Sequence, residues 1–459
     1  MAKVTVSLPQ GTRDFGADVV RKRNYIIQCI REAFERYGFQ PLETPAMENL
    51  ETLMGKYGEE GDKLIFKILN NGLNEEKNKA KATAGFEKVL QGKNDSGLTE
   101  RALRYDLTIP FARYVAMNYN QLTLPFKRYQ VQPVWRADRP QKGRYREFYQ
   151  CDADVVGSTS LLNEVELSSI YHEVFTKLGM KGYELRVNSR KILAGLAEIC
   201  GGVDQLIPIT IAIDKLDKIG LEKVQAELTE RGMNEEQIAR ITQYLNIDGS
   251  NAEKLEKISQ LLAQSEIGKA GLAELRFLTE SGLLPSDCPL VVDFTLARGL
   301  NYYTGIIFEA KAPASVKMGS IGGGGRYDDL TGLFGVPGVP GVGISFGLDR
   351  IYDVLEEMQL FPKSISIGTQ VLFFNNGESE AKKAFQLMQT LRNAGVRCEL
   401  FHEPSKFDKQ FKYAEKKNIP YIIIIGSREL AEQNFVLKDL RSGEQKTLPM
   451  ANLTEINFI

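Results

Sequence analysis

The chain has 459 residues, a formal net charge of −1, and 43% hydrophobic and 25% charged residues. This length allows two to four domains with buried cores, and the composition excludes a disordered chain. A net charge near zero gives no reason to expect a binder of bulk polyanions, although local basic patches stay open. The two histidines, His172 and His402, are too few for a histidine-rich metal site or a histidine-based charge relay.

The five cysteines are single, odd in number and without CxxC spacing. This usage indicates a reducing compartment and argues against a disulfide framework or a zinc ribbon. The first fifteen residues lack the apolar stretch of a signal peptide, and the longest aliphatic run, Tyr421–Ile425, is too short to cross a bilayer. We therefore expect a cytoplasmic multidomain protein that does not enter a membrane.

The N-terminal third predicts a helix, a polar insertion and a group of strands. Apolar residues at helical spacing indicate a helix over residues 14–37. Residues 71–98 are rich in Asn, Lys and Gly and predict a surface insertion with few core residues. Strand patterns follow over 101–156 around a helix-like stretch near 109–119, and a long helix is expected over 160–179.

The rest of the chain shows three kinds of pattern. Residues 189–282 are rich in Leu, Ile, Lys and Glu, with almost no strand signal, and predict a helical insertion. Strand and glycine signals return over 290–347, before a helix that reaches about residue 359. Beyond a linker at 362–368, helices and strands alternate as in a small α/β domain. The expected domains are one of residues 1–188 and 283–361, a helical insertion of residues 189–282, and a last one of residues 368–459.

Period-two alternation puts polar side chains on one face of two predicted strands. For either strand alone, a solvated face is the commoner explanation. Side by side in one sheet, the two faces would form a polar floor for an ammonium group and a second hydrogen-bonding group. These faces comprise Arg104, Asp106 and Thr108 in the strand Ala102–Ile109, and Phe148, Gln150, Asp152 and Asp154 in the strand Phe148–Val155.

The densest basic segment of the chain is Phe126–Phe148, with seven Lys or Arg against two acidic residues and with aromatic residues between them. Pro133, Pro140 and Gly143 predict a strand, a loop at about 137–144 and a returning strand. A solvated hairpin is the plain alternative. Clustered arginines among aromatic residues fit contact with phosphate or RNA better.

Two glycine-rich tracts, Ser320–Leu330 and Gly335–Gly347, adjoin predicted regular structure. They are either flexible linkers or places where a ligand approaches the backbone closely. Arg350 falls in the first turn of the following helix, where the helix dipole favours anions, and therefore predicts a phosphate partner. The P-loop and dinucleotide-binding glycine patterns are absent from the sequence.

Three segments together resemble class II aminoacyl-tRNA synthetases. Phe126–Asp154 is similar to motif 2 of that class, Gly343–Leu355 to motif 3, and Phe39–Pro45 weakly to motif 1. The segment Ala297–Gly305 resembles the signature of the histidyl-tRNA synthetase family, and the similarity covers essentially the whole chain. Within that signature, Asn301 stands where the family more commonly has Asp.

The resemblance implies an α+β catalytic domain built on an antiparallel sheet flanked by helices, with a helical insertion and a C-terminal α/β anticodon-binding domain. It implies that ATP activates L-histidine to histidyl-adenylate with release of pyrophosphate, and that histidine then passes to the 3′ end of tRNA(His). The expected partners are ATP, L-histidine, tRNA(His) and a second copy in a homodimer. Mg²⁺ is expected on the ATP phosphates, with no protein metal ligand predicted.

The resemblance also implies roles for single residues, and the residue types suit them. Guanidinium groups bind phosphate bidentately and stack on aromatic faces. A carboxylate opposite a tyrosine hydroxyl satisfies both nitrogens of an imidazole ring. Catalysis is expected of Arg136 and Arg298; ATP binding of Arg136, Phe148, Gly347 and Arg350; binding of histidine of Asp106, Thr108, Gln150, Asp154, Arg298, Tyr302 and Tyr303; and contact with the tRNA acceptor end of Arg139, Gln141, Lys142 and Arg144.

Two alternatives stay open from the sequence. One is a histidine-binding paralogue that regulates the first enzyme of histidine biosynthesis, but such paralogues generally lack the anticodon domain. The other is a class II synthetase for threonine, proline or glycine, which the segment Ala297–Gly305 argues against.

Overall fold

The computed structural model describes residues 6–297 and 302–458, without the side chains of residues 58–60, 217 and 218. Two compact units are present. The first comprises Met1–Asp14 and Ile26–Leu360, and the second Phe15–Tyr25 and Phe361–Ile459. Helix α1 (Ala17–Arg36) therefore contributes to both units. The helical insertion belongs to the first unit, and its separation as a domain of its own stays a prediction.

An eight-stranded sheet forms the centre of the first unit, in the order β1-β5-β6-β11-β10-β9-β7-β8. Its neighbouring strands are antiparallel except for β1 with β5 and β7 with β8. The predicted antiparallel α+β fold is confirmed. The strands are β1 (Gln40–Pro41), β5 (Phe126–Trp135), β6 (Glu147–Val156), β7 (Glu184–Ser189), β8 (Leu290–Val292), β9 (Ile306–Lys311), β10 (Ser320–Asp328) and β11 (Pro340–Gly347).

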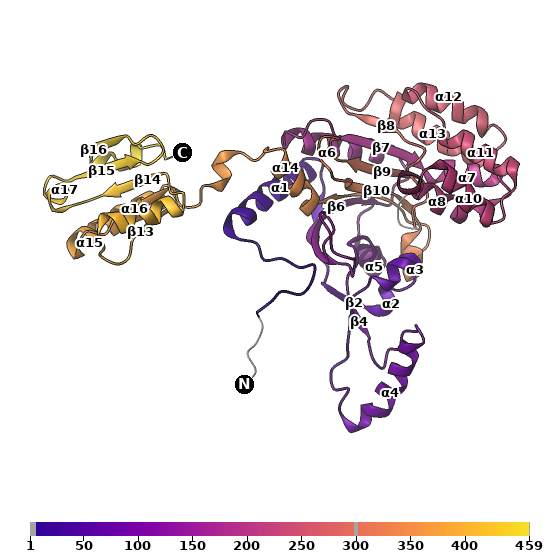
Figure 1. Ribbon diagram of the computed structural model, residues 1–459, viewed down its shortest axis with the longest axis horizontal. Helices are drawn as coiled ribbons and strands as arrows, with labels where there is room; N and C mark the ends of the chain where they lie inside the picture. Colours follow the sequence, from indigo (N-terminus) through magenta and orange to yellow (C-terminus); the bar gives the residue numbers. More distant parts are fainter. Residues whose placement is uncertain (1–5, 298–301, 459) are drawn as a thin grey trace. The chain divides into compact units, whose positions relative to one another are not determined.

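Helices α1, α6 (Leu162–Lys177) and α14 (Leu348–Glu357) pack on one face of this sheet (Figure 1). The ring of Phe346 in β11 lies 5.9 Å from that of Phe34 in α1 and 4.6 Å from that of Tyr171 in α6. Cys151 and Ala153 of β6 are fully buried. Because side chains alternate along a strand, the even-numbered residues of β6 point to the opposite face.

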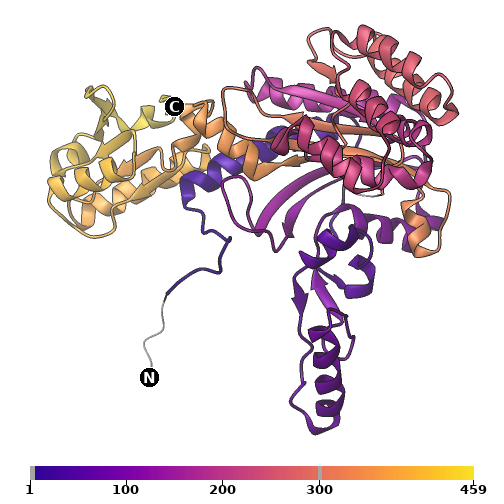
Figure 2. The ribbon, with the colours of Figure 1, turned by 45° about the vertical axis from the view of Figure 1, so that its right-hand side comes forward.

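Residues 190–280 form helices, as the sequence predicts, and sit beside β7, β8 and β9 (Figures 1 and 2). Helices α7 and α13 approach closely, because a Cβ atom on Gly195 would lie 2.7 Å from the Cα atom of Gly268. The helices are α7 (Arg190–Ile199), α8 (Leu206–Asp214), α9 (Leu216–Ile219), α10 (Leu221–Glu230), α11 (Glu235–Leu245), α12 (Asn251–Leu261) and α13 (Glu266–Glu280), with a short 3₁₀ turn at Val203–Gln205.

Across the described residues, no single helix has the length and apolar character to cross a membrane. One pair, Arg190–Ile199 with Val203–Asp214, reaches that length and composition only when its two parts are taken together, and these parts are bent by 118°.

Residues 71–109 contain one helix that was not predicted, and one prediction here was wrong in detail. The Asn- and Lys-rich insertion contains a helix of its own, α4 (Glu76–Leu90), because its Ala, Lys and Glu residues favour helix. The predicted strand Ala102–Ile109 ends after β4 (Arg101–Leu103), which forms a small sheet with β2 (Met47–Asn49) and β3 (Lys67–Ile68).

The strand ends early because Asp106 starts a turn. Its carboxylate accepts the backbone N–H of Ile109 at 3.1 Å, and helix α5 (Thr108–Asn118) begins there. Pro110 is tolerated because it stands in the first turn of this helix. Two short helices, α2 (Leu50–Leu53) and α3 (Gly58–Lys63), complete this part of the unit.

The second unit contains the predicted α/β domain. Its sheet has five strands in the order β13-β12-β14-β15-β16, parallel among the first three and antiparallel beyond. Its elements are β12 (Val371–Phe373), α15 (Glu378–Asn393), β13 (Cys398–Leu400), α16 (Phe407–Lys416), β14 (Tyr421–Ile424), α17 (Ser427–Ala431), β15 (Asn434–Asp439) and β16 (Gln445–Pro449).

Candidate active site

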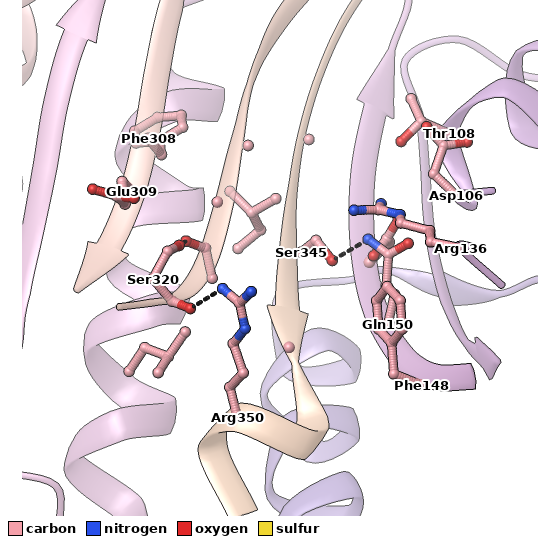
Figure 3. Close-up of a pocket in the computed structure, with 18 of the residues that line it drawn as sticks. Asp106, Thr108, Arg136, Phe148, Gln150, Phe308, Glu309, Ser320, Ser345 and Arg350 are labelled. Atoms are coloured by element: carbon pink, nitrogen blue, oxygen red, sulfur yellow. Dashed lines mark hydrogen bonds between the residues drawn. The ribbon is translucent and has the colours of Figure 1, made fainter. Parts of the chain in front are cut away.

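A cavity of about 470 Å³ opens on the large sheet, over the even-numbered face of β6. In Figure 3, Asp106, Thr108, Arg136 and Gln150 lie together on one side, and Arg350 lies apart from them, beside Ser320. Most of the predicted site residues line this cavity: Asp106, Thr108, Arg136, Arg144, Phe148, Gln150, Asp154, Tyr302, Tyr303, Gly347 and Arg350.

Four predicted residues do not line it or are not described. Arg139, Gln141 and Lys142 belong to the loop between β5 and β6 and are absent from the cavity wall. Arg298, the predicted catalytic residue of the family signature, lies outside the described residues. The same holds for Asn301.

Arg136 follows β5 and is fixed before any ligand binds. Its Nε donates to the backbone oxygen of Tyr105 at 3.0 Å. Its guanidinium lies 4.2 Å from the centre of the Tyr105 ring and 5.2 Å from that of Phe148. These contacts hold the flat group in place and use one of its five donors, so others are available to an anion.

Arg350 is held in the same manner on the first turn of α14. Its Nε donates to the backbone oxygen of Gly143 at 2.7 Å, and its Nη1 to that of Ser320 at 2.7 Å. Burial lowers the pKa of Arg350, and the positive charges of Arg144 and Arg136 lower it further. Three cations that repel one another at one cavity form a site for a multiply charged anion.

The tract Gly322–Gly325 is regular strand, so the flexible-linker interpretation was wrong for it. It pairs with β9 on one side and β11 on the other. A Cβ atom on Gly324 would lie 2.1 Å from the backbone oxygen of Gly343, and one on Gly343 would lie 1.9 Å from Oδ1 of Asp154. The glycines let the strands approach, and they leave bare backbone as part of the cavity floor.

Asp106 lines the cavity from the turn before α5, not from the predicted strand. Oδ1 accepts the hydroxyl of Tyr57 at 2.9 Å, and Oδ2 accepts that of Tyr302 at 3.4 Å. Burial raises the pKa of Asp106, while the N–H of Ile109 and the charge of Arg136 oppose this effect. A cationic ligand group beside Asp106 would favour the ionised carboxylate.

Gln150, Asp152 and Asp154 follow one another on the cavity face of β6. Gln150 donates from Nε2 to the hydroxyl of Ser345 at 3.0 Å (Figure 3). Tyr327 donates to Oδ1 of Asp154 at 2.6 Å. Oδ2 forms an ion pair with Arg128, whose Nη2 lies 2.8 Å away, but has no hydrogen-bond partner among the described residues. The side chains of these acids are almost fully buried.

Tyr302 and Tyr303 close this acidic side of the cavity, with their ring centres 5.0 Å apart. Burial raises the pKa of Tyr303, and the nearby negative charges of Asp154, Asp106 and Asp152 raise it further. Tyr303 therefore stays a neutral phenol that can donate or accept a hydrogen bond at neutral pH.

The loop between β5 and β6 is covered by the N-terminal segment, a contact that sequence reasoning missed. The backbone N–H of Arg146 donates to the oxygen of Gly11 at 2.9 Å. Arg13 forms an ion pair with Asp349, and its guanidinium lies 3.3 Å from the centre of the Tyr145 ring. One short segment thus links this loop to α14, which carries Arg350.

Sequence reasoning assigned no role to four residues of the cavity network: Tyr57, Asp152, Ser345 and Tyr327. The alternation that pointed to Gln150 and Asp154 placed Asp152 on the same face, so its signal was present. Tyr57 meets Asp106 only through the fold, and no sequence spacing could have shown that contact.

The cavity offers charged and hydrogen-bonding groups and not a histidine base. His172, one of the two histidines, contacts residues that do not line the cavity: its Nδ1 lies 2.8 Å from the hydroxyl of Tyr183, and its Nε2 lies 3.2 Å from Asp287. Among the described residues, no group of three or more His, Cys, Asp or Glu side chains could hold a metal ion. The arrangement suits binding of an anion and a cationic small molecule next to each other.

Comparison with known proteins agrees with this architecture. The model of the family described as histidyl-tRNA synthetase matches residues 75–351, and that of the anticodon binding domain matches residues 370–456. A histidine–tRNA ligase of Christiangramia forsetii is 53% identical over 450 residues, covering 98% of each chain. One of Bacteroides fragilis (strain YCH46) is 52% identical and covers 97% of each.

Solved structures show the same fold. The crystal structure of histidyl-tRNA synthetase from Nostoc sp. PCC 7120 is 35% identical, with a TM-score of 0.81 over 99% of each chain. A Bacillus halodurans protein, described as an ATP phosphoribosyltransferase regulatory subunit/histidyl-tRNA synthetase, has a TM-score of 0.72 at 22% identity and supports the fold alone. With a family match over more than half of its length and close relatives over nearly all of it, the chain belongs to the histidyl-tRNA synthetase family.

Proposed function

We propose that the chain is a histidine–tRNA ligase that works in the cavity described above. A carboxylate oxygen of L-histidine attacks the α-phosphorus of ATP, and pyrophosphate leaves. A ribose hydroxyl at the 3′ end of tRNA(His) then attacks the acyl carbon, and AMP leaves. The observation that carries the proposal is a fixed guanidinium, Arg136, beside the buried acceptors Asp106 and Gln150, with Arg350 across the same cavity.

The two arginines supply the ATP part of this mechanism. Arg136 binds the α-phosphate next to the amino acid, and Arg350 binds the adenine and outer phosphates together with Phe148 and the backbone at Gly347. Such a reaction needs positioning and charge stabilisation, not an enzyme nucleophile. Arg298 is proposed to stabilise the charge that grows on the α-phosphate during attack.

Mg²⁺ is proposed to bind mainly through the ATP phosphates. The described residues offer no cluster of metal ligands, and the carboxylate of Glu309 in the cavity wall fits a single supporting ligand. When bound, the ion neutralises phosphate charge.

The acidic side of the cavity would bind histidine. Asp106, Thr108 and Gln150 receive the ammonium group, and Tyr302 holds Asp106 in place. Asp154 and Tyr303 are proposed to face the imidazole ring. A ligand that lacked one ring nitrogen would leave a buried polar group unpaired, which commonly lowers activity by about 10⁴-fold or more.

Most of the RNA would bind outside the cavity, and its 3′ end would enter it. Arg139, Gln141, Lys142 and Arg144 lie on the basic loop between β5 and β6 and are proposed to contact the acceptor end. The second unit would bind the anticodon, in keeping with its family match. A homodimer in the cytoplasm completes the proposal.

Pyrophosphate exchange tests the proposal. Purified protein with ATP and Mg²⁺ should exchange labelled pyrophosphate into ATP only when L-histidine is added. Exchange with glycine, proline or threonine instead would reassign the substrate. Binding of histidine without any exchange would indicate a regulatory paralogue.

A further inference from the structure

The turn between β7 and α7 holds both ends of the segment of residues 296–305. The side chain of Asn188, near the end of β7, donates from Nδ2 to the backbone oxygen of Leu296 at 3.0 Å. The backbone N–H of Arg190, the first residue of α7, donates to the backbone oxygen of Gly305 at 2.8 Å. One turn thus fixes the segment where it begins and where it returns to β9.

This segment contributes to the histidine side of the cavity. Leu296, Tyr302 and Tyr303 line the cavity wall. Arg298, which is proposed to act in catalysis, falls within the segment in the sequence and lies outside the described residues. The residues proposed to bind ATP belong to β6, β11, α14 and the end of β5. A shift of the segment should therefore affect histidine and the chemical step more than the binding of ATP.

Asn188 is suited to the role of an anchor because both ends of its amide are bonded. The side chain is fully buried. Its Oδ1 accepts the backbone N–H of Ser189 at 2.8 Å, and its Nδ2 also donates to the hydroxyl of Tyr244 at 3.3 Å. A buried amide with partners on both ends is fixed in its orientation, and its removal leaves the oxygen of Leu296 without this donor.

Two helices of the helical insertion support this turn. Tyr244 belongs to α11, and it is fully buried against Asn188. Glu274 belongs to α13 and is also buried. Its Oε2 accepts the hydroxyl of Ser189 at 2.8 Å, and its Oε1 accepts Nζ of Lys191 at 2.5 Å. Charge-assisted hydrogen bonds of this kind are stronger than neutral ones, so the insertion holds the turn firmly.

The second end of the segment is bonded to β10 as well. The backbone N–H of Thr304 donates to the oxygen of Arg326 at 2.8 Å, and the Thr304 hydroxyl donates to Oδ2 of Asp328 at 2.9 Å. A Cβ atom on Gly305 would lie 3.1 Å from the side chain of Arg326. The amide of Thr304 is therefore protected, and its hydrogen exchange reports on the order of the segment.

We propose that Asn188 is a positioning residue for histidine activation, and that the helical insertion supports the chemical step by holding this turn through Tyr244 and Glu274. The inference rests on the proposed function and extends it to the insertion. Formation of histidyl-adenylate then depends on the insertion even in the absence of RNA.

The first test is Asn188→Ala in histidine-dependent pyrophosphate exchange without RNA. The substitution removes the donor to Leu296. A misplacement of about 1 Å at a reacting group costs up to about 100-fold in rate, so kcat/KM for histidine should fall by about 10- to 100-fold. The KM for ATP should stay within about twofold, because the ATP-binding residues lie on other elements.

The second test is Glu274→Gln, which keeps an oxygen for the hydroxyl of Ser189 and removes the charge that pairs with Lys191. It should lower kcat/KM for histidine by about three- to tenfold, with the KM for ATP unchanged. Glu266→Gln is the matched control, because Glu266 is an exposed acid of the same helix that pairs with Lys269. This control should behave as wild type.

Hydrogen–deuterium exchange measures the anchor directly. In Asn188→Ala, a fragment that covers residues 302–305 should exchange at least about tenfold faster than in wild type, because the segment is no longer held at its first end. Fragments of β5 and β6 should exchange as in wild type. Unchanged exchange of residues 302–305 beside a lowered kcat/KM would overturn the proposal.

The kinetics can overturn it in two further ways. Values within twofold of wild type in both Asn188→Ala and Glu274→Gln would do so. KM values for histidine and ATP that rise by the same factor would also do so, since general loosening affects both substrates. Should Asn188→Ala fail to fold, Glu274→Gln decides by the same criteria. Failure of the wild type to exchange pyrophosphate with histidine would refute the proposed function, whereas hydrogen exchange would still test the anchor.

Discussion

At the scale of single residues, the charged side chains of the cavity are held in place in two different ways. Arg136 and Arg350 are fixed by backbone oxygens, which orient a guanidinium without neutralising it. Asp106 and Asp154 are fixed by tyrosine hydroxyls, which orient a carboxylate in the same way. Arg136, Arg350 and Asp106 are thus positioned in advance with their compensation left to substrates, whereas Asp154 already forms an ion pair with Arg128.

Replacing Arg136 by Ala should lower histidine-dependent exchange by about 100-fold or more, because removal of one fixed donor to a developing charge commonly costs that much. The KM for histidine should change by less than about threefold. Arg231→Ala, at an arginine on the helical insertion that pairs with Glu227, is the control. Equal loss of kcat in both variants would contradict the role of Arg136.

A second prediction concerns the dependence of stability on pH. Burial raises the pKa of Asp152 to about 7 in the folded state, against about 4 in an unfolded chain. Between these values the folded state binds the extra proton, so the free energy of unfolding falls as pH rises through this window. Asp152→Asn should therefore have a higher Tm than wild type at pH 8, and the difference should shrink at pH 5. A difference that does not change with pH would show that Asp152 ionises normally in the fold.

At the scale of elements, the loop between β5 and β6 depends on a distant segment. Gly11 adopts a positive φ of 83°, and a Cβ atom there would lie 2.8 Å from the side chain of Arg146. Tyr145 is held from both sides, since Arg13 covers its ring and its hydroxyl donates to Asp353 of α14 at 3.1 Å. The N-terminal segment thus fixes the loop against α14.

Arg13→Ala should raise the KM for ATP and lower exchange by about tenfold, because the loop and Arg350 lose a common support. The KM for histidine should be nearly unchanged, since the contacts described for this segment are with the loop and α14. Arg31→Ala, at an exposed arginine of α1, serves as the control. Wild-type kinetics in Arg13→Ala would show that the segment is dispensable.

Strand β6 and the segment around Asp106 show where alternation in the sequence predicts the face of a side chain correctly and where it does not. Alternation along β6 correctly predicted which residues face the cavity, because both of its neighbours are regular strands. Alternation failed at Asp106, where a side chain captures the backbone of Ile109 and starts a helix. A hydrogen bond from the backbone to a nearby side chain can end a strand that alternation predicts, and residue spacing alone does not reveal such a bond.

At the scale of the whole molecule, the catalytic cavity and the α/β domain lie in different compact units. Adenylate formation should need only the first unit, and transfer to RNA should need both. Much of the order of elements was predictable, since period and turn residues mark most of them, but β2, β3 and the helices α2, α3 and α4 were not predicted. Contacts between residues distant in the chain, such as Arg13 with Asp349, were not.

Phe385→Ala should leave exchange unchanged and lower kcat/KM for tRNA(His) charging by about tenfold. Phe385 is 47% exposed beside a groove that also includes Gln386, His402 and Pro404, and exposed aromatic rings stack on unpaired bases at about 1–3 kcal/mol each. The measurement is aminoacylation with tRNA(His) transcript. Loss of exchange together with charging would indicate misfolding and not lost RNA contact.

The glycine tract of β10 has a consequence for inhibitor design. At Gly324, any side chain would collide with the backbone of β11, and at Gly322 it would meet the ring of Tyr171 at 2.8 Å. A competitive compound that lies flat on this floor would contact glycine backbone. A substitution that adds a side chain there would disrupt the sheet. Resistance by substitution would then have to arise elsewhere on the cavity wall.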